Sequence, residues 1–438
     1  MSDYMFMLES HLSSAQSRVV AQIQAVAAAA NTNVFLTGGA MRDMLGGLPI
    51  LDLDFTVEGN AIKLARTVAA KAKADIVEVD ENRKSARLVF PGGVQATVSM
   101  ARQEKYPKPG GKPQVQPATI HEDLRGRDFT INSIALSLNA ASRGLLLDPN
   151  NGFGDLERKE LRAVSNYTLY DDPIRLLRLQ RFKIKLGFTI GDRTKLQYDN
   201  AREAGLESRI LQPSLLEELR HIANEPNSAD VIKTLEDEKL LHLFSPALSG
   251  AKVNLAGLQK LQKAKQMVPF GVDIRLENFG LFLNILTEKS TAKEKTELIK
   301  GLGLTRADVD HWQKLEAKSK KLEKELKSAK LQKPSHIYQV LSKAPGDQVL
   351  FLLLRSSERI VQDRIKNYLQ KYLAAAQEIT DREVLATGVQ AGTPKFQKVR
   401  EEMILTRLDA RPKKVPPPVE APAPAPAPVP AGAFARNR

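Results

Sequence analysis

VFLTGGAMRDMLGGLPILDLDFTV, residues 34–57, is the stretch of this 438-residue chain that decides its fold. It opens with VFLT, a run of the length and composition of a short buried strand. A glycine pair then leads into GGAMRDML (38–45), which is typical of a turn that opens a helix. The run ILDLDFTV (50–57) predicts a second strand. This order of strand, turn, helix and strand indicates an α/β domain built on a mixed sheet.

Two carboxylates interrupt the second predicted strand. Asp52 and Asp54 are two residues apart, so in a strand their side chains point to the same face. Like charges held this close are unfavourable unless something compensates them. A solvated sheet face is one explanation, and a bound divalent metal ion is the other.

A candidate phosphate site precedes the carboxylates. Gly38 and Gly39 lie between strand and helix, where glycine lets backbone N–H groups approach a phosphate and the helix N-terminus favours negative charge. Arg42, one turn further on, can reach the same anion. A glycine pair alone is usually just a turn, but beside paired carboxylates it favours magnesium-dependent transfer from a nucleoside triphosphate.

The rest of the first 140 residues continues the α/β pattern. We expect a helix over 5–30, another over 60–74, and three further strands in DIVEVD, SARLVF and VQATVSM. Residues 105–124 are dense in Pro, Gly and Lys and therefore predict an exposed, mobile loop.

Helical periodicity replaces the strand signals from about residue 165 onward. Residues 313–333 predict a lysine-rich helix, which is either solvated and held by intrahelical ion pairs or in contact with a phosphate backbone. The Ala- and Pro-rich end of the chain, 411–438, predicts a disordered tail.

The composition narrows the possible functions. Lys and Arg number 65 against 51 Asp and Glu, and the net charge of +14 favours a polyanionic partner. The absence of cysteine excludes disulfides, thiolate zinc sites and thiol catalysis. The six histidines do not cluster in the sequence. Because we find neither a secretion signal nor a stretch long enough to span a membrane, we expect a cytoplasmic protein with no membrane partner.

These motifs resemble those of the class II tRNA nucleotidyltransferases and of the bacterial poly(A) polymerases that share their head domain. The resemblance is dense over about 34–190, where four motifs occur in the family's order, and a fifth similar segment lies near the C-terminus. The matching segments are 38–59, 101–136, 148–164, 171–188 and 379–404.

The resemblance implies an α+β fold with a polymerase-beta-like head. In the family, paired aspartates that Asp52 and Asp54 match hold Mg²⁺ while the 3′-hydroxyl of an RNA attacks the α-phosphate and pyrophosphate leaves. Arg127 and Asp128 match a second motif that lies near the ribose and the triphosphate.

Asp172 and Arg175 match the residues with which the family reads the incoming base. Three residues apart on a helix, they share a face. Together they can pair with the amino donor and ring acceptor that adenine and cytosine both present, so ATP and CTP are the expected substrates. Asp172 before Pro173 is alternatively a favourable helix N-cap. Arg178 and Arg181 continue along the same face, where they either meet phosphates or lie at the surface.

Three departures from the family pattern leave room for an atypical enzyme. Thr97 stands where related nucleotidyltransferases carry a third carboxylate. Gly126 replaces the first of two arginines, and Asp171 replaces a glutamate. None of these changes removes the metal pair or the base-reading pair.

We therefore expect an enzyme that adds C and A nucleotides to the 3′ end of tRNA. A poly(A) polymerase or an enzyme that adds only CC or only A remains an alternative, as does a non-catalytic RNA-binding protein with the same fold. The oligomeric state stays open. We expect a catalytic nucleotidyltransferase head over 1–140, a helical neck with the nucleotide-selecting helix over 141–210, an RNA-binding helical body and tail over 211–410, and the Pro/Ala-rich tail over 411–438.

Overall fold

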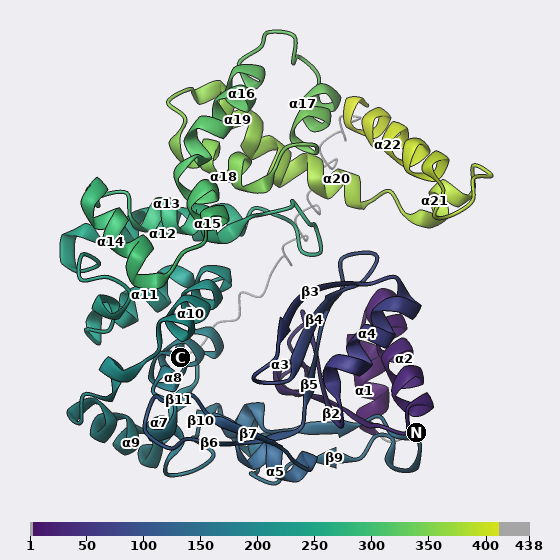
Figure 1. Ribbon diagram of the computed structural model, residues 1–438. Helices are drawn as coiled ribbons and strands as arrows, with labels where there is room; N and C mark the ends of the chain where they lie inside the picture. The colour runs from purple at the N-terminus through teal and green to yellow at the C-terminus, as the bar shows by residue number, and fades with distance from the viewer. Residues whose placement is uncertain (1–2, 411–438) are drawn as a thin grey trace, which may run out of the picture.

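The computed structural model describes residues 3–410 (Figure 1). It confirms the predicted α+β class, with a mixed-sheet head at the N-terminal end followed by helices. The predicted disordered tail, 411–438, lies outside the described residues. Within 3–410, no helix has both the length and the apolar character needed to cross a membrane.

The head is built on a seven-stranded sheet. Only β2 and β5 run parallel, and the other neighbouring strands are antiparallel. In spatial order the strands are β3 (Asp75–Asp80), β4 (Ser85–Val89), β5 (Gln95–Met100), β2 (Leu53–Glu58), β1 (Asn33–Thr37), β8 (Ala135–Ser137) and β9 (Leu146–Leu147).

The second predicted strand begins later than expected, at Leu53 rather than at residue 50. Asp52 therefore lies just before the strand, and only Asp54 lies within it. Leu53, Phe55 and Val57 are all buried and anchor the strand in the head core. The predicted helix directly after β1 is present as α3 (Gly38–Leu45).

The single helix predicted over 5–30 is wrong, because the chain forms two helices, α1 (Asp3–His11) and α2 (Ser14–Ala29). Ser13 caps α2: its hydroxyl accepts a hydrogen bond from the Gln16 N–H at 3.2 Å. The Gln16 side chain in turn accepts from the Ser13 N–H at 2.9 Å. This capping box starts a new helix inside an otherwise continuous apolar pattern. α2 packs against α4 (Ala61–Ala72), and both contact the sheet.

The loop predicted over 105–124 is largely ordered structure instead. β6 (Arg102–Lys105) and β7 (Gln114–Pro117) form an antiparallel hairpin, and α5 (Ile120–Arg125) follows. The tip of the hairpin docks on a later part of the chain, because Gly110 N–H donates to the Asp171 carbonyl at 3.0 Å. The Pro and Gly residues therefore lie at the tip of a hairpin, which contacts the chain at Asp171 closely.

Between residues 148 and 410, the regular structure is helical apart from one short parallel pair, β10 (Glu160–Leu161) with β11 (Thr189–Ile190). In Figure 1, α8 and α10 lie beside the head, and the helices from α16 onward lie at the far end of the molecule. The helices are α6 (Gly152–Arg158), α7 (Thr168–Asp171), α8 (Ile174–Leu186), α9 (Asp192–Glu203), α10 (Gln212–Asn224), α11 (Ser228–Asp237), α12 (Leu255–Lys265), α13 (Asn278–Leu286), α14 (Ala292–Leu302), α15 (Arg306–Gln313), α16 (Leu315–Leu326), α17 (Pro334–Leu341), α18 (Gly346–Arg355), α19 (Arg359–Asn367), α20 (Leu373–Gln377), α21 (Asp381–Leu385) and α22 (Pro394–Asp409).

The lysine-rich helix predicted over 313–333 ends early, at Leu326. The Arg364 guanidinium donates to the carbonyl of Leu326, to that of Ser328 at 3.0 Å and to that of Leu331 at 2.7 Å. These three carbonyls no longer need helical partners, so the chain can leave the helix before α17 begins at Pro334.

We expect Gly110→Ala to release the hairpin tip. Gly110 has φ +69°, and a Cβ there would lie 2.5 Å from the Arg209 carbonyl oxygen. Gly47 has the same φ with nothing within 4 Å of a Cβ, so Gly47→Ala isolates the backbone cost of about 1 kcal/mol. Because Lys108 and Lys112 each precede a proline, which blocks trypsin, the test uses the broad-specificity protease subtilisin, which should cleave the Gly110→Ala protein faster within 106–113 than either the Gly47→Ala or the unaltered protein. Equal cleavage of all three would contradict the docking.

Candidate active site

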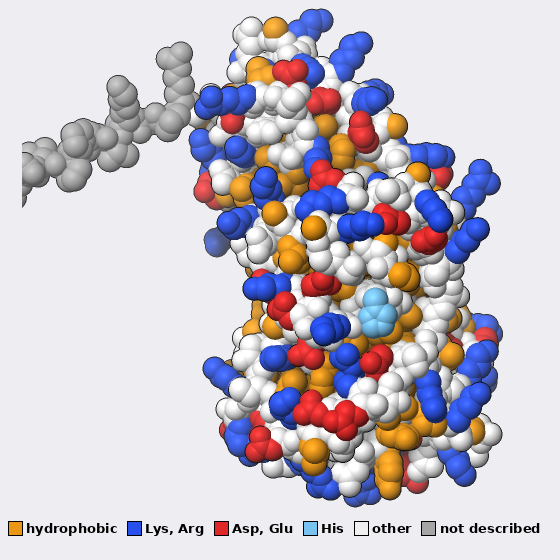
Figure 2. Space-filling model, turned by 90° about the vertical axis from the view of Figure 1, so that its left-hand side faces the viewer, with side chains coloured by type: hydrophobic (Ala, Val, Ile, Leu, Met, Phe, Trp, Pro, Cys, Tyr) orange, Lys and Arg blue, Asp and Glu red, His pale blue; other side chains and the backbone are white. Residues whose placement is uncertain are grey.

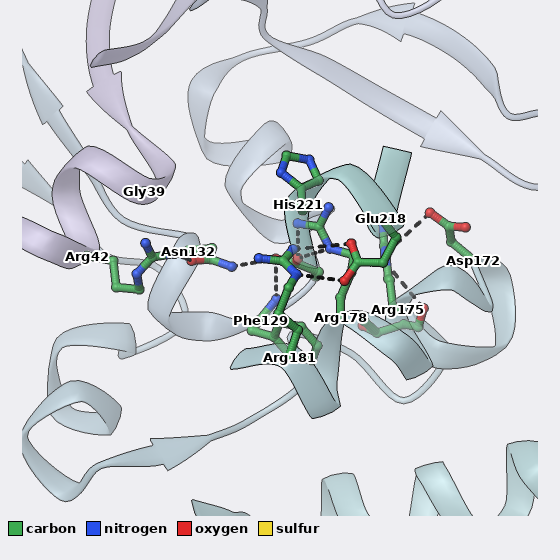
Figure 3. A network of polar contacts seen from close by, with 12 residues as sticks. Gly39, Arg42, Phe129, Asn132, Asp172, Arg175, Arg178, Arg181, Glu218 and His221 are labelled. Carbon is green, nitrogen blue, oxygen red and sulfur yellow. Dashed lines mark hydrogen bonds and ion pairs between the residues drawn. The ribbon is translucent and has the colours of Figure 1, made fainter. Parts of the chain in front are cut away.

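A cavity of about 480 Å³ lies between the head and the helices α8 and α10. The sequence-predicted residues that line it come from both sides: Gly38, Gly39, Arg42, Asp54, Arg127 and Asp128 from the head, and Asp172, Arg175, Arg178 and Arg181 from the helical part. Asp52 is the one predicted site residue outside the lining, because it lies just before β2. Figure 3 shows how the polar side chains of the two walls converge.

The glycine turn and Asp54 are in direct contact. Gly39 N–H donates to Asp54 Oδ2 at 3.3 Å. Gly38 has φ +62°, and a Cβ there would lie 3.3 Å from both Asp54 Oδ2 and Arg127 Nη1. Glycine is therefore required here for its backbone conformation and for the close approach of the carboxylate.

The two carboxylates lie in an environment that disfavours their charge. Burial raises the pKa of Asp54, and the nearby charge of Asp52 raises it further. Asp52 is more exposed than Asp54, but partial burial also raises its pKa, although the charges of Lys185 and Arg87 act in the opposite direction. Neither carboxylate forms an ion pair within residues 3–410.

These features fit a divalent cation. Carboxylate oxygens are hard donors of the kind that Mg²⁺ prefers, and a cation would remove the penalty on both charges. No third His, Cys, Asp or Glu completes a metal-binding cluster within the described part of the chain. Asp54 pairs in register with Thr97 on β5, so the departure noted in the sequence lies directly beside it.

Asp128 is held ionised by arginine. Arg178 donates to its Oδ2 through Nε at 3.0 Å and through Nη2 at 2.6 Å. Phe129 N–H and the Asn132 amide donate to its Oδ1 at 2.7 and 3.1 Å. Burial alone would raise the pKa of Asp128, but Arg178 and then Arg175 hold it well below its usual range.

Arg127 keeps one free donor group beside the glycine turn. Its Nε and Nη2 bind the Asp123 carboxylate at 2.9 and 2.8 Å, and Nη2 also donates to the Thr56 hydroxyl at 2.9 Å. Nη1 makes no hydrogen bond or ion pair within residues 3–410 and faces Gly38. An anion held beside the turn would thus meet the Nη1 group of this guanidinium.

Asp172 does not cap the following helix, so the capping alternative is wrong. α8 begins at Ile174 after Pro173, and the helix start has no side-chain cap. The Asp172 carboxylate instead lies 3.7 Å from Arg175 Nε and accepts from the Tyr106 hydroxyl at 3.5 Å. Arg175 itself makes only two long hydrogen bonds to backbone carbonyls, at 3.4 and 3.5 Å. Both side chains therefore retain polar groups for a further partner.

Arg181 has a different environment from Arg178. It is 4% exposed, so the surface alternative is wrong. Its guanidinium binds Glu218 at 2.7 and 3.2 Å and Glu225 at 2.9 Å, and both carboxylates come from α10 or its C-terminal end. Arg181 thus joins α8 to α10, although its side chain still borders the cavity.

Several polar residues that line the cavity, or lie directly behind its lining, carry no signal in the sequence. Arg83 of the head lies 3.7 Å from Glu217 of α10, whose carboxylate is also 3.8 Å from His221. Tyr106 donates to Glu104 at 2.8 Å beside Asp172, although it does not line the cavity itself. The lining residues that no sequence signal marked include Arg83, Glu104, Glu217 and His221.

Part of this chain is similar to known proteins. Residues 34–162 match the model of the poly A polymerase head domain. An A-adding tRNA nucleotidyltransferase from Aquifex aeolicus is 29% identical over 341 residues, which cover 77% of this chain and 40% of the relative. A CC-adding tRNA nucleotidyltransferase from Deinococcus radiodurans is 34% identical over 206 residues, 47% of this chain and 54% of the relative. The chain thus spans less than two thirds of these relatives.

A solved structure of a CCA-adding enzyme in an apo form has the same fold. It aligns with a TM-score of 0.55 at 24% sequence identity, and the alignment covers 94% of this chain and 96% of the other. This solved structure supports the fold alone. Residues 34–162 match the poly A polymerase head domain, and the chain is similar to A-adding and CC-adding tRNA nucleotidyltransferases, which confirms the resemblance inferred from its motifs.

We expect Asp54→Asn to stabilise the metal-free protein by about 1 kcal/mol near neutral pH. The folded-state pKa of Asp54 is raised, so the ionised carboxylate weakens folding above that pKa. The gain should shrink as the pH falls through the raised pKa and vanish below the pKa of the unfolded chain, where both states are protonated. Urea denaturation across this pH range measures it.

Asp128→Asn is the matched control. The pKa of Asp128 is lowered, so removing its charge should destabilise the protein by about 2 kcal/mol near neutral pH and leave Arg178 without its partner. Destabilisation by both substitutions would mean that Asp54 is held by favourable contacts after all.

Proposed function

We propose that the chain is a template-independent tRNA nucleotidyltransferase that transfers C and A nucleotides from CTP and ATP to an RNA 3′ end. The proposal rests on one observation: a single cavity holds the Asp54 carboxylate against the glycine turn on one wall and the Asp172–Arg175 pair on the other. Its relation to A-adding and CC-adding tRNA nucleotidyltransferases supports the reaction class.

Asp52 and Asp54 would hold Mg²⁺. Within residues 3–410, Asp54 is the one carboxylate of the cavity lining without an ion pair to arginine, and Asp52 lies two residues before it. Held by these two carboxylates, the metal would neutralise the triphosphate and lower the barrier to attack of the 3′-hydroxyl on the α-phosphate, with pyrophosphate as the leaving group. The triphosphate would bind beside the glycine turn, at the N-terminus of α3, where Arg127 Nη1 lies next to Gly38 with no hydrogen bond or ion pair within residues 3–410.

The base-reading role of Asp172 and Arg175 follows from their free polar groups. The carboxylate accepts from the exocyclic amine of adenine or cytosine, and the guanidinium donates to the adjacent ring nitrogen. Uracil and guanine carry an N–H at that ring position, which the guanidinium cannot accept. The pair therefore selects ATP and CTP without a nucleic-acid template.

The helical part offers a surface for the rest of the RNA. A groove of about 930 Å³ lies between α16 and α17 at the far end of the molecule from the catalytic cavity (Figure 1). Its basic residues are Lys318, Lys321, Lys330, His336 and Lys343, and Glu325 is its one acidic residue. None of the four lysines is ion-paired within residues 3–410. In Figure 2, the surface at this end of the molecule, at the top of the view, shows more basic than acidic side chains.

Extension assays test the proposed reaction. The protein is incubated with Mg²⁺, each α-labelled nucleoside triphosphate, and tRNA lacking either its terminal CCA or only the last A. We expect incorporation from CTP and then from ATP, and none from UTP or GTP. Incorporation of only CC or only A would assign a partial enzyme, whereas long A tracts would indicate a poly(A) polymerase.

The matched control is the double variant Asp52→Ala, Asp54→Ala, which should abolish incorporation while the helical part still binds tRNA. Residual incorporation by this variant would mean that the metal site is misassigned. A protein that binds tRNA but incorporates nothing in its unaltered form would be the non-catalytic RNA-binding protein.

We expect Lys318→Glu, Lys321→Glu to weaken tRNA binding without changing nucleotide affinity. Each lost phosphate contact lowers the slope of log affinity against log salt by roughly 0.7–0.9, so the slope should fall by about 1–2. The control is Lys63→Glu, Lys71→Glu, which makes the same charge change on the exposed face of α4 in the head. Filter binding over a salt series measures both, and equal effects would indicate net charge alone.

A further inference from the structure

One aromatic ring in the cavity wall is surrounded by three arginines. Phe182 on α8 is 4% exposed, and the guanidinium carbons of Arg42, Arg178 and Arg181 lie 5.3, 5.8 and 4.7 Å from its ring centroid. Phe129 of the head meets the same ring edge-on, with centroids 5.8 Å apart and an interplanar angle of 81°.

Packing alone does not account for this arrangement. Each guanidinium has a carboxylate partner on another side, Asp43 for Arg42, Asp128 for Arg178 and Glu218 for Arg181. An aliphatic residue at 182 would fill the space without attracting them. The face of an aromatic ring carries negative potential and attracts guanidinium groups, most strongly where water is excluded. The ring is therefore suited to hold cations close to one another.

The ring also joins the two walls of the cavity. Arg42 belongs to α3 of the head, whereas Arg178 belongs to α8. A chain of hydrogen bonds connects them around the ring: Arg42 donates to Asn132 at 2.9 Å, Asn132 donates to Asp128 at 3.1 Å, and Arg178 donates to Asp128 at 2.6 Å. The ring and this chain fix the two guanidinium groups relative to each other across the boundary between head and helices.

We infer that Phe182 is a positioning residue for the triphosphate of the incoming nucleotide. It acts through Arg178, whose Nε and Nη2 bind Asp128 and whose Nη1 makes no hydrogen bond or ion pair within residues 3–410. Arg42 is engaged by Asp43 and Asn132 and lies against the same ring from the head side. The inference rests on the proposed function and adds a determinant of phosphate affinity on the helical wall. Base selection by Asp172 and Arg175 does not depend on it.

The test compares Phe182→Leu with two other variants in the full-length protein. Phe182→Tyr keeps the ring and can direct its hydroxyl into the cavity. Phe279→Leu is the matched control, because Phe279 is also 4% exposed and lies 4.4 Å from the Arg220 guanidinium, but it belongs to α13 and does not line the cavity. Phe182→Met provides a second ring-free variant if Phe182→Leu does not fold.

We expect the ring-free variants to bind ATP, CTP and inorganic triphosphate roughly 5- to 30-fold more weakly in the presence of Mg²⁺, as the loss of one or two desolvated cation–π contacts would give. The ratio of UTP to ATP dissociation constants should not change. KM for nucleotides should rise with little change in kcat, and Phe182→Tyr should stay within about twofold of the unaltered protein. Phe279→Leu should lower Tm and leave nucleotide binding unchanged.

Unchanged triphosphate affinity in a folded ring-free variant would overturn the inference, whatever its Tm, and would leave the proposed function standing. Loss of base discrimination together with affinity would also overturn it, because the ring would then act on the whole site. If the unaltered protein binds neither ATP nor CTP, the proposed function itself is wrong and the inference falls with it.

Discussion

The contact between the Asp54 carboxylate and the glycine turn is the constraint on which the site depends. It requires β2 to begin at Leu53, α3 to begin directly after β1, and Gly38 to adopt a positive φ. It also keeps the Asp54 carboxylate beside Asp52 with no ion-paired cation within residues 3–410. Burial and charge repulsion raise the pKa of both carboxylates, so their ionised forms weaken folding. Such a cost is retained where a ligand compensates it.

The arginines around the cavity divide into two kinds. Arg181 and Arg178 have carboxylate partners at hydrogen-bonding distance and hold elements together. Arg127 and Arg175 instead keep donors that no residue of the described chain engages well. A binding surface needs both kinds of arginine. The ion-paired guanidinium groups set the geometry, and the guanidinium groups with unengaged N–H donors contact the ligand.

Short-range signals explain why much of the site could be predicted from the sequence. The glycine turn and the two aspartates lie within one supersecondary unit, and Asp172 and Arg175 lie within one turn of helix. Contacts between distant segments could not be predicted in this way. Arg83 meets Glu217, and Tyr106 meets Asp172, only because the hairpin and α10 fold against the same cavity. The hairpin itself was missed because its Pro- and Gly-rich composition is shared with loops.

The position of Thr97 beside Asp54 in the sheet limits the number of carboxylates at the proposed metal site. Register places Arg87, Thr97 and Asp54 side by side on three neighbouring strands, so their side chains share one face of the sheet. A third carboxylate at Thr97 would raise the pKa of Asp54 further, whereas threonine adds no charge. Under the proposed function, two carboxylates would match the charge of one divalent ion, and oxygens of the triphosphate or of water would complete its coordination. The proposed site would thus hold metal and nucleotide together.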